Sequence, residues 1–106
     1  MRDGLYRVQF QTPMGRAAGV VVFADGTVRG GDSVMYYTGH FAENGGKVSG
    51  EIVARRHTPG AQSVFKLDPV TIAFTGSAEG GNIEIAGNAR EAPDVAFKAT
   101  LSPLGD

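Results

Sequence analysis

The stretch GVVVFADGTVRGGD, residues 19–32, decides the fold of this chain. Its first half is a run of β-branched and aromatic residues that ends at Phe23, and Asp25-Gly26 follows almost at once. A type I′ turn needs two successive residues with positive φ, and Asp-Gly supplies them at low cost. The stretch therefore predicts a β-hairpin in which Phe23 lies opposite Val28.

A glycine corner follows this hairpin. Gly30 and Gly31 interrupt the alternation of apolar and polar residues, and Asp32 comes directly after them. An Asp at a turn accepts hydrogen bonds from backbone amides just ahead of it in the chain. We expect Gly31 to adopt a positive φ, where the Cβ of any other residue would clash. Gly30, Gly31 and Asp32 thus predict a structural turn that leads into a strand from Ser33 to Ala42.

Further strands follow the same alternation. Residues 5–12 place Tyr6, Val8 and Phe10 on one face and polar residues on the other. Asn44-Gly45 is a second hairpin signal. With those two residues as the loop, the pairing sets Phe41 opposite Val48, Tyr37 opposite Ile52 and Gly39 opposite Gly50. The remaining strands are predicted over residues 17–24, 47–57, 70–77, 82–89 and 95–101.

Glycine is unusually common, with 16 residues in a chain of 106. This is about twice the average frequency of roughly 7%, and the glycines separate short apolar stretches. Eight short strands joined by tight turns predict an all-β protein, an eight-stranded antiparallel β-barrel that forms a single domain over residues 1–106. Residues 61–67 could add one short helical turn at the barrel end. A small β-sandwich is the alternative architecture.

The composition excludes several function classes. The 10 Lys and Arg residues are balanced by 11 Asp and Glu residues, so the basic excess typical of nucleic-acid binders is missing. Without cysteine, disulfides and cysteine-based zinc sites are impossible. No apolar run has the length of a signal peptide or a membrane span. These features predict a cytoplasmic protein with no nucleic acid, membrane or metal among its partners.

Catalytic signals are also missing. The two histidines, His40 and His57, do not belong to any nucleophile-elbow or metal-binding motif. The glycine-rich segment at residues 76–81 lacks the lysine of a phosphate-binding loop and does not introduce a helix. We therefore expect no enzyme activity, no catalytic residue and no cofactor.

The aromatic residues are the better candidates for function. Tyr36 and Tyr37 are adjacent, so on a strand they point to opposite faces. The outward ring and its neighbour, Val34 with Tyr36, predict a protein interface. The inward residues are candidates to line a cavity for a small apolar ligand, namely Tyr6, Phe10, Tyr37 and Phe97. The sequence leaves open whether the interior is filled or hollow.

Three motifs occur here in a family order: DGLY at residues 3–6, GVVVFADGTVRGGD at residues 19–32 and Tyr-x-Gly at residues 37–39. This chain resembles the GrlR-like family of type III secretion negative regulators. The resemblance implies a lipocalin-like eight-stranded barrel that is also similar to streptavidin. It further implies a homodimer and a non-enzymatic regulatory function through protein contacts. A carrier or sensor of a small apolar ligand is the alternative function.

The hairpin tip after the Tyr-x-Gly strand departs from the family pattern. The best-known relative carries an acidic Glu-Asp-Glu-Asp loop there, which contacts a transcriptional activator. Residues 42–47 of this chain contain one acid, Glu43, and Lys47 nearly cancels its charge. We therefore expect any partner to contact the strand of Tyr36 or the barrel mouth instead.

Overall fold

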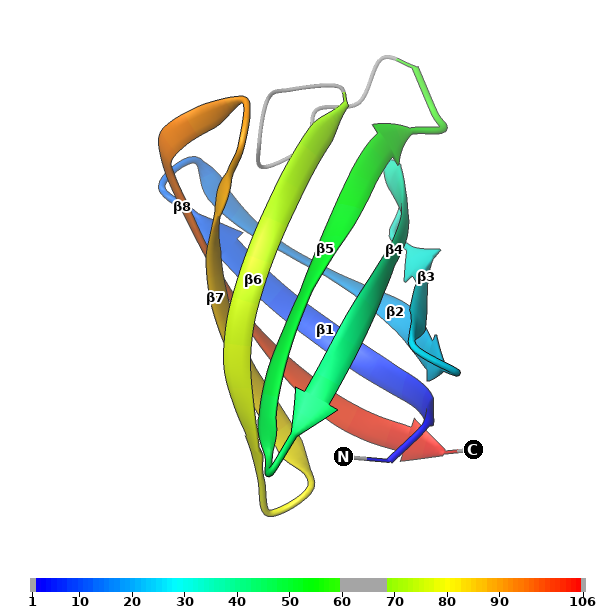
Figure 1. The fold of residues 1–106 in the computed structure, drawn as a ribbon. Helices are drawn as coiled ribbons and strands as arrows, with labels where there is room; N and C mark the ends of the chain where they lie inside the picture. Colours follow the sequence, from blue (N-terminus) through cyan, green and yellow to red (C-terminus); the bar gives the residue numbers. More distant parts are fainter. Residues whose placement is uncertain (1, 60–68, 106) are drawn as a thin grey trace.

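Eight antiparallel strands form a closed barrel (Figure 1). The computed structural model describes residues 2–59 and 69–105, and the strands lie within them. In order they are β1 (Gly4–Thr12), β2 (Gly15–Ala24), β3 (Thr27–Gly31), β4 (Met35–Asn44), β5 (Lys47–Arg56), β6 (Val70–Glu79), β7 (Asn82–Ala89) and β8 (Ala92–Gly105). The predicted eight-stranded barrel is confirmed, and the β-sandwich alternative is excluded. The helical turn expected at residues 61–67 lies outside the described residues.

The hairpin at residues 19–28 forms as expected. Asp25 and Gly26 connect β2 to β3 with φ values of 52° and 77°. Phe23 pairs with Val28 across the turn. Both central residues therefore have the positive φ that a type I′ turn requires.

The register between β4 and β5 differs from the expected one. Gly45 and Gly46 form the turn with φ values of 61° and 85°, so Asn44 pairs with Lys47. Phe41 consequently lies opposite Gly50. The three expected pairings are therefore wrong, namely Phe41 with Val48, Tyr37 with Ile52 and Gly39 with Gly50. Glycine enters the left-handed region without steric cost, whereas Asn44 would have to adopt it against its Cβ.

Close packing of the sheet explains the glycine corner. Neither Gly30 nor Gly31 has a positive φ, so the conformation expected for Gly31 is wrong. Both residues belong to β3 instead. A Cβ at Gly30 would lie 2.0 Å from the carbonyl oxygen of Val20, and one at Gly31 would lie 2.8 Å from that of Met35. Glycine is required here because neighbouring strands approach closely.

Aromatic rings and cross-strand glycines together fill the interior. The rings of Phe23 and Phe41 meet edge to face with centroids 4.9 Å apart, and Phe10 meets Phe97 at 5.9 Å. Gly50 pairs with Phe41 on one side and with a second phenylalanine on β6 on the other. Small residues beside large ones let bulky side chains share a narrow barrel.

The strands β1 and β8 close the barrel. Tyr6 pairs with Pro103, and Leu5 pairs with Gly105 after a register shift. The last strand thus extends beyond the predicted end at Leu101. Figure 1 shows the start of β1 next to the end of β8 at one end of the barrel.

Candidate functional site

The four predicted cavity residues pack into the core. Tyr6, Phe10, Tyr37 and Phe97 are all buried. Among the described residues, the interior void bordered by three of them, Phe10, Tyr37 and Phe97, has a volume of about 40 Å³ and an apolar lining. Binding pockets for small ligands commonly measure roughly 300–1,000 Å³. The interior is therefore close to filled.

Asp32 organises the turn between β3 and β4. Its Oδ1 accepts hydrogen bonds from the backbone amides of Val34 and Met35, each at 2.8 Å. Its other carboxylate oxygen accepts a hydrogen bond from the Tyr37 hydroxyl. Burial, together with this hydrogen bond and the negative charge of Asp32, raises the pKa of Tyr37 far above its usual value. The sequence predicted the capping role of Asp32 but not its contact with Tyr37.

His57 is attached to the same turn. Its backbone amide donates to the carbonyl oxygen of Val34 at 2.9 Å. Its ring Nε2 lies 2.9 Å from the carbonyl oxygen of Asp32, and Nδ1 lies 2.7 Å from the hydroxyl of Thr58. These contacts connect the end of β5 to the turn. They give His57 a structural role.

Val34 and Tyr36, the predicted interface residues, have different environments. Val34 precedes β4, is half-buried and packs against the core, so it does not share an outward face with Tyr36. The capping by Asp32 draws the turn inward and delays the start of the strand until Met35. Tyr36 points outward as expected, with 41% of its surface exposed.

The outer side of β1 to β5 carries a continuous surface around Tyr36. We name it the arginine–valine face and define it by Arg7, Val20, Val22, Arg29, Tyr36 and Arg55. Cross-strand pairing aligns Arg7, Val20, Gly31, Tyr36 and Arg55 in one row, and Leu5, Val22, Arg29, Thr38 and Val53 in the next. Among the described residues, the face holds three of the five exposed large hydrophobic side chains.

All charged side chains of the arginine–valine face are positive. The three arginines are exposed, and none of them forms an ion pair with another described residue. Neither row contains an acidic residue. Glu51 lies one row further along β5, and it already pairs with Arg90 on the β7–β8 turn. The alternating arginines were missed in the sequence because their alignment depends on the register of four strand pairs.

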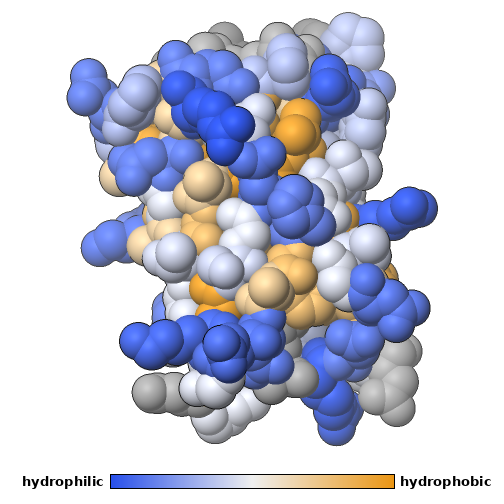
Figure 2. All heavy atoms as spheres, in the orientation of Figure 1, coloured by the Kyte–Doolittle hydropathy of each residue, from blue (hydrophilic) through white to orange (hydrophobic). Residues whose placement is uncertain are grey.

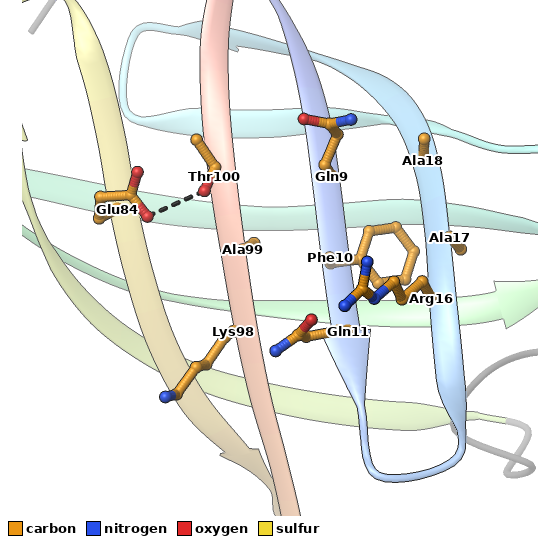
Figure 3. Close-up of a pocket in the computed structure, with 10 residues that line it drawn as sticks. All are labelled: Gln9, Phe10, Gln11, Arg16, Ala17, Ala18, Glu84, Lys98, Ala99 and Thr100. Atoms are coloured by element: carbon orange, nitrogen blue, oxygen red, sulfur yellow. Dashed lines mark hydrogen bonds between the residues drawn. The ribbon is translucent and has the colours of Figure 1, made fainter.

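The sides of the barrel next to this face carry both polar and apolar residues. Figure 2 shows hydrophilic and hydrophobic residues interspersed over the side formed by β4, β5 and β6, which includes the β4–β5 part of the arginine–valine face. A groove of about 610 Å³ crosses the outer side of β7, β8, β1 and β2 (Figure 3). Gln11 pairs with Arg16 on one side and Lys98 on the other, and Thr100 donates to Glu84 at 2.9 Å. Among the described residues, no cluster of His, Asp and Glu is suited to a metal ion.

Comparison with protein families identifies the family of this chain. The model of the GrlR family, described as a T3SS (type III secretion system) negative regulator, matches residues 1–105. The chain belongs to the GrlR family. The eight-stranded barrel fits the lipocalin-like architecture expected for a GrlR relative. A search of curated proteins finds no match. No helix among the described residues is long and apolar enough to cross a membrane.

Proposed function

We propose that this GrlR-family protein is a non-enzymatic cytoplasmic regulator that acts by binding another protein through the arginine–valine face. The observation that carries the proposal is the exposure of Val20, Val22 and Tyr36 between arginines that form no ion pair within residues 2–59 and 69–105. Tyrosine and arginine are enriched at protein interfaces and often dominate their binding energy. Family membership supports a regulatory role in type III secretion.

The filled interior supports protein binding over the alternative of a ligand carrier. A void of about 40 Å³ would have to expand severalfold before it could hold a small apolar ligand. The rings of Phe10, Tyr37 and Phe97 would then have to move away from one another. No such rearrangement is needed for a contact on the outside of the barrel.

Two kinds of partner are candidates for the arginine–valine face. A second copy of the chain would form the homodimer that the family resemblance predicts, with Tyr36 near a two-fold axis. The exposed valines favour this because a small apolar patch is doubled by symmetry. A different protein is favoured by the three arginines, which form no ion pair with an acidic residue among the described residues.

The regulatory part of the proposal is tested in the native host. Deleting the gene should raise the expression of type III secretion genes, and restoring the unmodified protein should lower it again. Tyr36→Glu should fail to restore repression because it places a charge in the apolar part of the face. Thr75→Glu, an outward change on β6 away from this face, is the matched control and should restore it. Unchanged expression in the deletion strain would contradict the regulatory role.

The self-association of the purified protein is tested separately. Sedimentation velocity should show a dimer that Tyr36→Glu converts to a monomer if a second copy occupies the face. A monomer across the accessible concentration range would exclude the homodimer and leave a different protein as the partner.

A further inference from the structure

We infer that the partner of the arginine–valine face is a different protein, which presents an amphipathic segment with acidic side chains spaced between apolar ones. This inference rests on the proposed function and specifies the chemistry of the partner. The observation behind it is the order of side chains around the barrel. Arg7 on β1, Arg29 on β3 and Arg55 on β5 alternate with the valines on β2 and Tyr36 on β4.

The spacing of the arginines defines what can bind. Neighbouring strands lie about 4.8 Å apart, so Arg7 and Arg29 are separated by about 10 Å around the barrel. They lie in adjacent rows, which adds about 7 Å along the strands and gives a separation of about 12 Å between their Cα atoms. Residues i and i+7 of an α-helix are about 10.5 Å apart along its axis, and residues i+3 and i+4 lie between them on the same face. A helix laid obliquely across the strands can therefore place acidic residues within reach of the long side chains of Arg7 and Arg29, with an apolar residue over the valines of β2.

A second copy fits this face less well. An isologous contact would bring three arginines from each copy into one interface, and neither row supplies an acid to neutralise them. Like charges that face each other across an interface are unfavourable, and desolvation increases the cost. The next outward acid on β5, Glu51, already pairs with Arg90.

A nucleic acid also fits less well. The chain has a net charge of −1, so it lacks the basic excess that is typical of nucleic-acid binders. Phosphate binding draws on lysine and arginine and gains little from valine. The centre of this face is formed by Val20, Val22 and Tyr36, which are suited to an apolar contact.

The probe for this inference is a pair of synthetic helical peptides. One peptide carries Glu at every seventh position with Leu midway between, and the other carries Lys in place of each Glu. Fluorescence anisotropy with the full chain should show binding of the Glu peptide that weakens as salt is raised. The Lys peptide should bind at least tenfold more weakly because its charges repel the arginines.

Two variants locate the contact. Arg29→Gln should weaken binding of the Glu peptide by about threefold to fivefold, the effect of losing one exposed ion pair. Lys98→Gln, which removes a cation from the groove on β8, is the matched control and should leave binding unchanged. Circular dichroism establishes that both variants keep the β-sheet signal.

The outcomes that would contradict this inference differ from those that would contradict the proposed function. Equal binding of the two peptides, equal losses in the two variants, or preferred binding of a duplex DNA oligonucleotide would overturn the inference. A dimer that Tyr36→Glu dissociates would also overturn it, but would leave the proposed protein-binding function intact. Failure of the host experiment instead contradicts the proposed function itself, whatever the peptides do.

Discussion

The two faces of β4 differ sharply although their residues alternate along one strand. On the inner face, Met35 and Tyr37 are 2% and 5% exposed, and the Tyr37 hydroxyl is bound to Asp32. On the outer face, Tyr36 is 41% exposed and lies between Arg55 and Gly31 without a partner of its own for the hydroxyl among the described residues. The same residue type is thus buried and hydrogen-bonded at position 37 and exposed at position 36.

The largest expected effect tests whether side chains inside the barrel, such as Phe97 on β8, contribute more to stability than those on the outer face. Phe97→Ala removes a ring that is 3% exposed and should lower the free energy of unfolding by about 3–5 kcal/mol. Tyr36→Ala should lower it by less than about 1 kcal/mol, because the outward ring packs against little. Urea denaturation measures both values. Similar losses in the two variants would show that inner and outer side chains contribute equally to stability.

A smaller effect tests the close approach of strands at the glycine corner. Gly30→Ala places a Cβ 2.0 Å from the carbonyl oxygen of Val20, so β2 and β3 must separate locally. We expect a loss of about 1–3 kcal/mol, the usual cost of overpacking a well-packed site. Arg29→Ala, on the outer side of the same strand, should change stability by no more than about 0.5 kcal/mol. Thermal denaturation measures the change. A Gly30→Ala variant that unfolds at the same temperature as the unmodified protein would contradict the close approach of β2 and β3.

The smallest effect concerns the contribution of Tyr37 to the pH dependence of stability. The pKa of Tyr37 is raised in the folded protein, so above pH 10 the hydroxyl ionises in the unfolded chain first. Stability present below that pH is therefore lost as the pH rises. Between pH 9 and pH 10.5 the loss from this group is about 0.8 kcal/mol. Urea denaturation at the two values should show a smaller decline for Tyr37→Phe than for the unmodified protein.

Thr38→Val is the matched control for this measurement. It changes an exposed residue of the same strand that carries no ionisable group, so its alkaline decline should equal that of the unmodified protein. A reduced decline in Thr38→Val, or an unchanged one in Tyr37→Phe, would show that the Tyr37 hydroxyl does not dominate the loss of stability at alkaline pH.

Much of the fold was predictable because its turns are local. Asp25-Gly26 determines a hairpin within a few residues, and no distant contact is needed to recognise it. The β4–β5 tip was harder because Asn44, Gly45 and Gly46 offer two overlapping turns, and the pairing shifts with the choice. The alternation of faces survived this error, so Tyr36 was still assigned to the outside.

Most errors in the candidate site have non-local causes, and Val34 is the exception. Gly31 is required by the carbonyl of Met35 on the next strand, not by its own backbone angle. Val34 was misplaced because the capping by Asp32 shifts the start of β4. The alternation of arginines on β1, β3 and β5 appears only after the registers are known, since these residues lie more than 20 positions apart in the chain.

The pairing of β1 with β8 has a kinetic consequence. Most other strand pairs join neighbours through tight turns and can form with little loss of chain entropy, whereas this pair brings together residues as far apart as Leu5 and Gly105. The entropy of closing a loop rises with the logarithm of its length, so this one contact carries the greatest cost of ordering. The barrel thus consists of strand pairs between sequence neighbours and one long-range pair, β1 with β8. We expect substitutions in this long-range pair, such as Leu101→Ala, to speed unfolding more than they slow folding in stopped-flow measurements.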